Sequence, residues 1–332
     1  MDFRTELTLK PSTRPIGLTD PVLTLGSCFA QSIGQQFSDA KFKTLVNPLG
    51  TIYHPFSIHK LLHYVVYQEY PPVHTYLASN DMYYNYDLHS SYRHVQLADL
   101  RRQLQERIAF VHHFLSDCKV LLITWGTAWI YERNDNGEAV ANCHKMPAML
   151  FTKRLASVEE IMTSFDIMFK ALTSFNPGIR IVLTLSPVRH LKDTLELNHV
   201  SKSTLRLAAH QISNSYLPVD YFPSYEIMLD DLRDYRFYKN DLIHPTKTAE
   251  EYIWEKFSNV YFDSATRQLL SKWNEIRKAL SHKPFYAEGN PYQQFLRETL
   301  TRVEEIQSEI DVEQELQQLR SQLSGLQHDR TR

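Results

Sequence analysis

The chain has 332 residues, of which 43% are hydrophobic and 22% are charged, a globular rather than a disordered composition. Its formal net charge of -2, without a strongly basic block, argues against nucleic acid as the main partner. Three cysteines without a CxxC pair exclude a disulfide framework, and no apolar run is long enough to span a membrane. The N-terminus lacks the pattern of a signal peptide, so we expect a cytoplasmic protein.

A short apolar run near the N-terminus ends at a turn of small residues. Residues 22–25 have the pattern of a buried strand, Gly26 and Ser27 follow it, and residues 32–37 have the pattern of a helix. Ser27 is therefore expected at the carboxyl edge of a sheet, where open α/β folds bind their ligands. It is either a helix N-cap or a reactive group beside the free N–H groups of a helix start.

Strands and helices alternate along the rest of the chain. Strands are predicted over 43–46, 119–127 and 179–188, an aromatic strand or hairpin over 81–89, and helices over 57–66, 97–117, 158–175 and 249–257. Continuous apolar strands alternating with helices predict a parallel sheet covered on both faces. Residues 260–285 should continue as helix and close this domain. Residues 286–332 are predicted to form an amphipathic helix, or a short coiled coil through which the chain could oligomerise.

Two loops between these elements carry polar residues. In the loop 47–55, Gly50 is either part of an ordinary turn or a point where a backbone N–H approaches a ligand. Cys143 and His144 are adjacent in another loop, and adjacent residues rarely form a nucleophile pair or a metal site. His59 and His63, four residues apart on one helix, lack a neighbouring carboxylate. We therefore expect neither a metal nor a cofactor.

Asp241 and His244 are the second part of the sequence that indicates a function. They lie three residues apart, just before a helix that Thr246 or Thr248 could cap. A tight turn would bring the carboxylate to the imidazole, hold its tautomer and stabilise the imidazolium during proton transfer. Such a pair is common by itself, so its meaning depends on what faces it.

Taken together, these motifs resemble the GSCFA-domain family, a bacterial branch similar to SGNH/GDSL hydrolases. The resemblance covers roughly residues 20–258 and rests on residues 25–30, 47–51, 125–129, 142–145, 186–189, 221–226, 232–237 and 241–245. It implies a doubly wound α/β/α sandwich with a mostly parallel sheet. The implied domains are an SGNH-like catalytic domain over 1–285 and a C-terminal amphipathic helix over 286–332.

The resemblance also implies roles for particular residues. Ser27 would be the nucleophile, His244 the general base and Asp241 its orienting acid. Gly50 would correspond to the oxyanion-hole glycine, joined by the backbone N–H of Ser27.

One departure from the SGNH pattern leaves an oxyanion donor open. The pattern has an asparagine in a Gly-x-Asn turn after the middle strand, whereas residues 126–128 here are Gly-Thr-Ala. Asn142, folding back from the following loop, is the preferred replacement because its amide can donate in the same way, with Thr127 as the alternative. Arg189, His190 and Arg236 could bind an anionic substrate, or form ordinary ion pairs.

The implied function is a serine-dependent esterase that removes small acyl groups, acetyl above all, from a carbohydrate through an acyl-serine intermediate. An acyltransferase using the same serine and a non-catalytic carbohydrate-binding module remain alternatives. Cys28 as the nucleophile is disfavoured, because its thiolate would point off the turn differently from Ser27. The expected partner is a small ester or carbohydrate ester, and neither nucleic acid nor a membrane.

Overall fold

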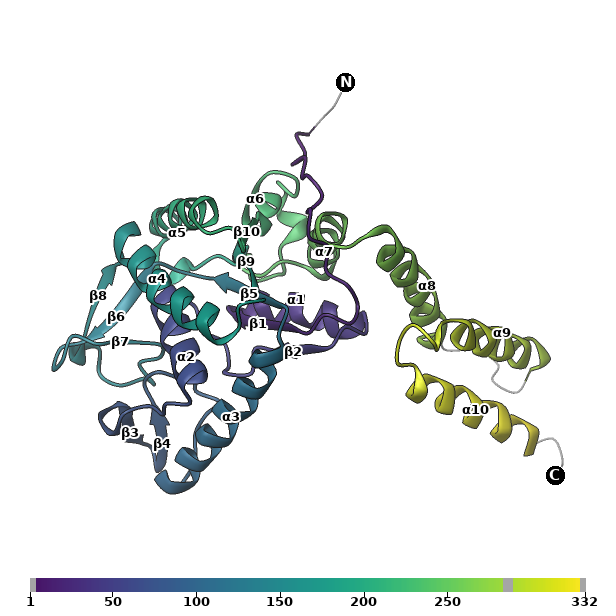
Figure 1. Ribbon diagram of the computed structural model, residues 1–332, viewed down its shortest axis with the longest axis horizontal. Helices are drawn as coiled ribbons and strands as arrows, with labels where there is room; N and C mark the ends of the chain where they lie inside the picture. The colour runs from purple at the N-terminus through teal and green to yellow at the C-terminus, as the bar shows by residue number, and fades with distance from the viewer. Residues whose placement is uncertain (1–3, 283–288, 329–332) are drawn as a thin grey trace.

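The computed structural model describes residues 4–282 and 289–328 (Figure 1). Its central sheet has five parallel strands in the order β10-β9-β5-β1-β2. These are β1 (Val22–Gly26), β2 (Thr44–Val46), β5 (Val120–Trp125), β9 (Arg180–Leu185) and β10 (Val219–Phe222). From β1 the chain winds outward in both directions, so the strand order reverses between β1 and β5. Ligands of doubly wound sheets bind at such a switch point, beyond the carboxyl ends of the strands.

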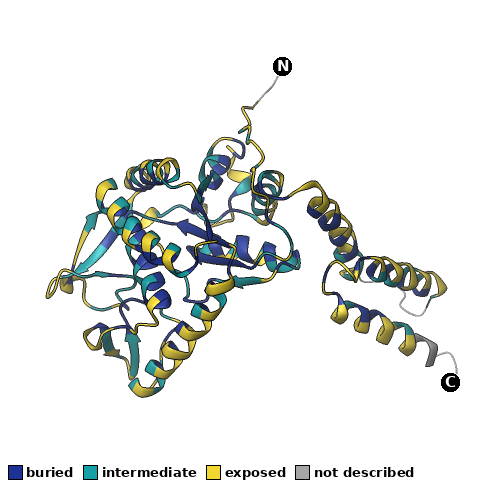
Figure 2. Ribbon diagram, viewed as in Figure 1, coloured by how far each residue is buried: buried dark blue, intermediate teal, exposed yellow. Residues whose placement is uncertain are grey.

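Alternating side chains of the strands build one core on each face of the sheet. Leu23, Leu121 and Ile123 pack against α2 (Pro55–Tyr67), α3 (Leu97–Asp117), α4 (Val158–Phe175) and α5 (Leu195–Ser215). Val22 and Leu122 pack on the other face against α1 (Cys28–Asp39), α6 (Ser224–Leu229) and α7 (Lys247–Tyr261). The buried strands run through the middle of the body in Figure 2. The α/β/α sandwich predicted from the sequence is thus confirmed.

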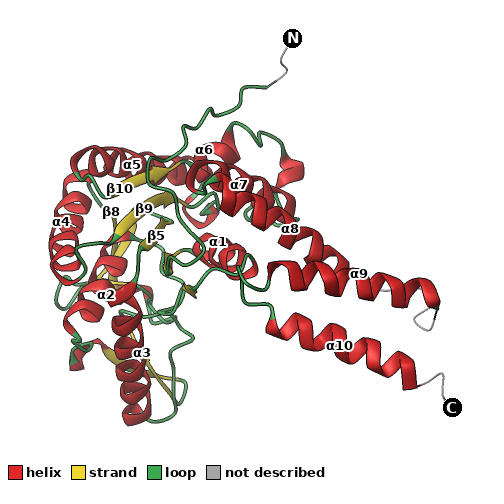
Figure 3. Cartoon of the chain, turned by 45° about the vertical axis from the view of Figure 1, so that its right-hand side comes forward, coloured by secondary structure: helices red, strands yellow, loops and turns green. Residues whose placement is uncertain are grey.

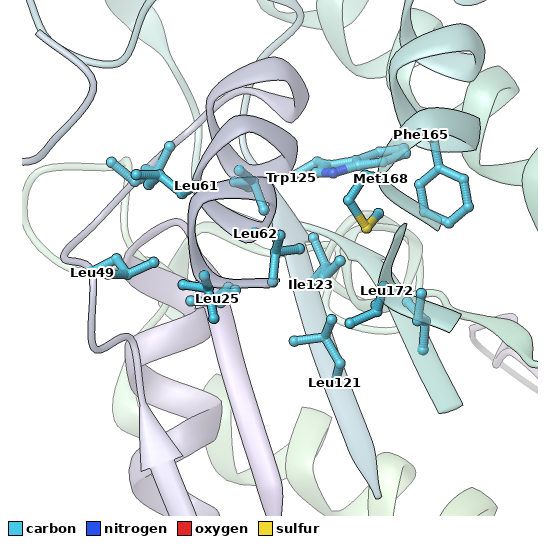
Figure 4. Packing of buried hydrophobic residues seen from close by; sticks show 14 of the residues in the cluster. Leu25, Leu49, Leu61, Leu62, Leu121, Ile123, Trp125, Phe165, Met168 and Leu172 are labelled. Carbon is cyan, nitrogen blue, oxygen red and sulfur yellow. The ribbon is translucent and has the colours of Figure 1, made fainter. Parts of the chain in front are cut away.

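Figure 4 shows part of the first core at close range. Leu25, Leu121 and Ile123 of the sheet face Leu62 of α2 and Leu172 of α4, and all five are at most 3% exposed. Burying one such side chain contributes roughly 1.5–3 kcal/mol, so the sheet is held firmly against these helices. The carboxyl ends of β1 and β5 therefore have a fixed relation to each other.

Two smaller sheets lie beside this body. One is a hairpin of β3 (Tyr76–Ser79) and β4 (Met82–Asn85), so the strand or hairpin predicted over 81–89 contains β4, whereas its partner β3 precedes that range and 86–89 is not strand. A three-stranded antiparallel sheet of β7 (Ala139–Val140), β6 (Trp129–Arg133) and β8 (Phe151–Leu155) follows β5 and was not predicted.

The C-terminal region forms a helical unit that projects from the α/β body (Figures 1 and 3). It comprises α8 (Ser264–Leu280), α9 (Asn290–Ile306) and α10 (Glu313–His328), which share a core containing Trp273, Val303 and Leu319. The prediction of one helix over 260–285 is wrong, because α7 ends at Tyr261 and Asp263 caps α8. The region from 290 onward likewise contains two helices rather than one.

The expected domain boundary between 285 and 286 falls outside the described residues. Because α8 packs with α9 and α10, the helical unit begins before this boundary, after α7. No helix among the described residues is both long and apolar enough to cross a lipid bilayer.

Candidate active site

The turn from β1 into α1 is fixed by its glycine and by an asparagine. Gly26 has φ +133°, and a Cβ there would overlap the carbonyl oxygen of Thr124, so the position needs glycine. Asn47 Oδ1 accepts the N–H of Gly26 at 2.9 Å, and Asn47 Nδ2 donates to the Gly26 carbonyl oxygen at 3.2 Å. Both contacts are buried, so the direction in which the chain enters α1 is strongly determined.

Ser27 is the N-cap of α1 and lies entirely inside the protein. Its side chain turns back onto the helix, where Oγ accepts the N–H of Phe29 at 3.2 Å, and its residue exposure is 0%. It does not line the pocket that contains His244, and it makes no hydrogen bond to His244 within the described chain. The expectation that the hydroxyl of Ser27 faces the imidazole across a pocket is therefore wrong.

Cys28 is the residue of this turn that reaches a pocket. It is the first residue of α1, it is half-buried, and it lines a cavity of about 490 Å³ together with His244. Ser27 caps α1 with its side chain, and the next residue, Cys28, lines the pocket at the edge of the sheet. Cys28, the nucleophile disfavoured from the sequence, is thus the residue of this turn that shares a pocket with His244.

The loop before α7 holds the acid and the base together, as the sequence predicts. Asp241 Oδ2 accepts the Nδ1–H of His244 at 2.7 Å, while Oδ1 accepts the N–H groups of Ile243 and His244 at 2.9 and 3.0 Å. The two backbone hydrogen bonds are the main reason why the pKa of Asp241 lies well below its usual value. The hydrogen bond from the imidazole lowers it further. With Nδ1–H directed at the carboxylate, His244 Nε2 carries the lone pair needed by a general base.

The pocket continues from Cys28 along the surface of α1. Its walls come from α1, α7 and the loops before α7 and after β9: Cys28, Phe29, Gln31, Ser32, Gln35, Gln36, Asp39, Val188, Lys239, His244, Pro245, Lys247 and Glu250. From Cys28 to Asp39 the helix rises about 16 Å. Most of the lining residues carry amide, hydroxyl or charged groups, and Phe29, Val188 and Pro245 add apolar surface, so the pocket is a groove of mixed polarity along α1.

The backbone N–H groups that the sequence predicted as oxyanion donors are hydrogen-bonded to other residues. The N–H of Ser27 donates to the Thr124 carbonyl oxygen at 3.1 Å, and that of Gly50 donates to Asn47 at 2.9 Å. Gly50 has φ +82°, and a Cβ there would come within 2.5 Å of the His89 Cβ. The structure thus corrects the roles given to Ser27 and Gly50. The N–H of Cys28 donates to no other residue in the described chain, so it is the backbone donor left at this helix start.

Asn142 is not brought to the pocket either. It follows β7, its Oδ1 accepts the N–H of His144 at 2.8 Å, and its own N–H donates to Tyr86 at 3.2 Å. Thr127 Oγ1 lies 3.1 Å from Ser201 Oγ and accepts the N–H of Trp129 at 3.0 Å. The sequence offered no signal for these partners, because each contact joins segments far apart or depends on a turn.

Arg189 supports the loop that carries the acid and base rather than lining the groove. Its Nη1 donates to the Leu242 carbonyl oxygen and its N–H to that of Ile243, both at 3.3 Å. The guanidinium lies 3.9 Å from the ring centre of Tyr238. Arg236 is exposed beside another open pocket. The contacts of Arg189 are therefore those of a residue that positions the loop.

His190 lies on the other side of the switch point, next to Gly126. Its Nε2 is buried without a hydrogen-bond partner in the described structure, and its ring meets that of Tyr53 edge-on at 5.5 Å. Burial, reinforced by the charge of Lys202, lowers the pKa of His190 to about 4, so the ring is neutral near pH 7. A neutral imidazole does not supply the positive charge expected of an anion-binding residue.

The thiol of Cys28 experiences opposing influences. Burial raises its pKa, the N–H groups of Cys28 and Phe29 and the ammonium of Lys202 lower it, and Glu250 raises it again. The resulting pKa lies above the ordinary thiol value, so near pH 7 Cys28 is mostly protonated and needs a base.

No three His, Cys, Asp or Glu side chains of the described residues gather closely enough to hold a metal ion.

Comparison with known proteins gives two matches to family models. A model described as the GSCFA family matches residues 21–257, and a model described as the C-terminal domain of GSCFA domain proteins matches residues 273–325. No curated protein sequence matches the chain.

Several solved structures are similar at low identity. A carbohydrate esterase family 3 protein from Talaromyces cellulolyticus has 10% identity and a TM-score of 0.35, covering 76% of this chain and 99% of its own. A putative platelet activating factor structure from Streptococcus pneumonia has 12% identity and a TM-score of 0.38, with coverages of 73% and 86%. A family two carbohydrate esterase from Clostridium thermocellum has 11% identity and a TM-score of 0.36, with coverages of 78% and 66%. Likeness at this level does not bear on the chemistry of the site.

Proposed function

The chain belongs to the GSCFA family, and from its site we propose that it is an acyl ester hydrolase whose nucleophile is the thiol of Cys28. The observation that carries the proposal is that Cys28 and His244 line one pocket, whereas Ser27 is wholly buried. The bond from His244 to Asp241 supplies the third member of a nucleophile, base and orienting acid arrangement.

The reaction follows from these three groups. Nε2 of His244 takes the proton of the Cys28 thiol, and the sulfur attacks the ester carbonyl to form a tetrahedral oxyanion. The N–H of Cys28 donates to this oxyanion, and the departing alkoxide takes the proton back from the imidazolium. Water, deprotonated by the same nitrogen, then attacks the thioester, releases the acid and restores the thiol. Asp241 holds the tautomer throughout and favours the transient imidazolium.

The groove supports a substrate with a small acyl group and a hydroxyl-rich alcohol part. Gln31, Gln35 and Gln36 and the hydroxyl of Ser32 lie along it, and such groups pair with hydroxyls rather than with a hydrocarbon chain. We therefore propose an acetyl ester of a carbohydrate as the substrate class. The same thioester could pass its acyl group to a sugar hydroxyl, which would make the protein an acyltransferase.

Turnover of 4-nitrophenyl acetate by the wild type and by Cys28→Ala, His244→Ala and Ser27→Ala tests the nucleophile. We expect the first two variants to lose at least about a hundredfold in kcat/KM, because both groups act in the acyl transfer itself. Ser27→Ala should keep a functional thiol and lose stability. Mass spectrometry of the wild type mixed with substrate should find the acyl group on Cys28.

Other results would assign the site differently. Loss of turnover in Ser27→Ala alone, with Cys28→Ala active, would restore the serine as nucleophile and contradict the proposal. Equal turnover in all four proteins, at the rate of buffer, would leave a carbohydrate-binding module. Adding a sugar acceptor and measuring transferred ester against free acid separates transfer from hydrolysis.

A further inference from the structure

Lys202, near the middle of α5, is buried at the carboxyl edge of the sheet. Its residue exposure is 1%, and its Nζ donates to the carbonyl oxygens of Gly126 at 2.8 Å and Ser186 at 2.6 Å. These two residues immediately follow β5 and β9. The ammonium thus joins the ends of two neighbouring strands at the edge that holds the candidate active site.

The charge of Lys202 has no fixed counter-ion. None of its contacts within the described chain is to a carboxylate, and its hydrogen-bond acceptors are neutral carbonyl groups. A buried ammonium without a counter-charge is costly, and two carbonyls could be satisfied by a neutral amide at lower cost. Consistent with this cost, burial lowers the pKa of Lys202 to about 7. The positive charge itself, rather than the two hydrogen bonds, is the feature that requires an explanation.

Cys28 is the titratable group placed to use this charge. Gly26 and Thr124 are register partners on adjacent strands, and the N–H of Ser27 donates to the Thr124 carbonyl oxygen, so Cys28 follows the strand next to the one whose end Lys202 binds. Lys202 and Cys28 interact electrostatically, each favouring the charged form of the other.

The other groups around Lys202 do not neutralise it. His190 after β9 is neutral, and Tyr53 before α2 has a pKa raised by burial. From α6 the ring of Tyr225 presents its face 5.5 Å from Nζ, and Glu250 of α7 acts on Cys28 in the opposite sense to Lys202. His244 lies across the groove, paired with Asp241. Among the described residues no carboxylate of this edge pairs with Lys202, so its counter-charge must arise at Cys28 or enter with a ligand.

We propose that Lys202 is the built-in counter-charge of this site, where its buried ammonium favours negative charge on Cys28 Sγ and on acyl intermediates formed there. The second part rests on the proposed function, and the first part does not. Lys202 acts through Cys28 and through the two strand ends that it joins, so it is a positioning and charge-supplying residue rather than a catalytic one.

Thiol reactivity tests the charge without requiring any esterase activity. In a Cys143→Ser background, the rate of Cys28 alkylation by iodoacetamide is measured from pH 6 to pH 10 for the protein with Lys202 and for Lys202→Met. Below pH 7, where Lys202 keeps its proton, we expect alkylation of Cys28 to be about tenfold slower in the variant, equivalent to about one unit in the thiol pKa, and the difference should shrink at higher pH as Lys202 becomes neutral. Lys192→Met removes an exposed lysine at the start of the segment leading into α5 and should leave the profile unchanged.

A second measurement keeps the test decisive if Lys202→Met does not fold. In the same background, Cys28 is modified with iodoacetate, which adds an anionic carboxymethyl group, or with iodoacetamide, which adds a neutral group of similar size. The anionic adduct should have the higher Tm, because its carboxylate supplies the missing counter-ion. Equal Tm values for the two adducts, or identical alkylation profiles with and without Lys202, would overturn the proposal even if the ester chemistry stands. A failure of the proposed ester hydrolysis alone would not contradict this role of Lys202.

Discussion

Gly26 determines where the chain leaves β1, and its environment accepts no side chain. A Cβ there would overlap the Thr124 carbonyl oxygen, and φ is +133°. Because the obstacle is backbone in the middle of the sheet, relaxation would have to move β5 or the start of α1. We expect Gly26→Ala to lower the free energy of unfolding by about 3 kcal/mol or more, measured by urea denaturation.

Gly137 provides the matched control for this substitution. Its φ is +73°, and no atom lies within 4 Å of where a Cβ would be. Gly137→Ala should therefore incur only backbone strain, about 1 kcal/mol. If the two variants lost equal stability, the contact with Thr124 would not be what constrains the turn.

The adjacent residues Ser27 and Cys28 mark the limit of prediction at the residue scale. The strand and helix patterns placed this turn at the carboxyl edge of the sheet, and the family resemblance added His244 to it. Which of two neighbouring side chains faces the pocket depends on the first helical residue, and α1 begins at Cys28, whereas the predicted segment began at residue 32. The N-cap role considered for Ser27 was the part of the sequence argument that held.

Among the elements, α1 connects the candidate active site to the C-terminal helical unit. Cys28 is its first residue and Asp39 its last, and the Asp39 carbonyl oxygen accepts the indole N–H of Trp273 in α8 at 2.7 Å. Asp39 also pairs with Arg277 at 2.6 Å, and Lys41 just beyond α1 pairs with Glu315 of α10 at 2.8 Å. The unit is thus held at the end of the helix opposite Cys28.

Trp273→Phe tests this attachment. The substitution keeps an aromatic ring in the core of the unit but removes the hydrogen bond to Asp39, at a cost of about 1 kcal/mol. We expect faster amide hydrogen exchange in α8, with β1 and β5 unchanged. Trp254→Phe in α7, whose indole forms no hydrogen bond to another described residue, is the control. Equal exchange in α8 for both variants would mean that the indole N–H does not hold the unit.

Helix prediction succeeded where the end signals are local. The range 158–175 was correct, and α4 begins at a capping box in which Ser157 and Glu160 bond each other's backbone. The C-terminal region was mistaken for one helix because apolar spacing continues through the break at 307–312. Ile310 and Val312 lie in this break and are still buried in the same core. The apolar spacing indicates which residues are buried, but it does not show that the backbone between the two helices is not helical.

At the scale of the whole molecule, the sandwich was predictable but the order of its strands was not. Continuous apolar runs such as 120–125 indicate strands buried on both faces. The short β10 was missed because it contains Asp220, which pairs with Arg180 of β9. The position of the switch point beside β1 follows from pairing across the sheet, and pairing joins residues about a hundred positions apart.

Two buried histidines of α2 and its cap should make the stability of the molecule fall in mild acid. Burial lowers the pKa of His54 to about 4 and that of His59 to about 3, from 6.5 when unfolded. Between pH 6.5 and 4 the unfolded chain takes up protons that the folded protein does not, so folding weakens as the pH falls. Each histidine contributes up to about 1.4 kcal/mol per pH unit.

Urea denaturation at pH 7, 6 and 5 measures this dependence, and His59→Gln isolates one of its sources. His59 bonds Ser164 Oγ at 2.9 Å and packs between Trp125 and Phe165, so the variant should be less stable at pH 7. Its stability should nevertheless fall less steeply than that of the wild type between pH 6.5 and 5, because a glutamine takes up no proton on unfolding. Parallel curves for the two proteins would mean that His59 gains no proton on unfolding, and that burial does not control its charge.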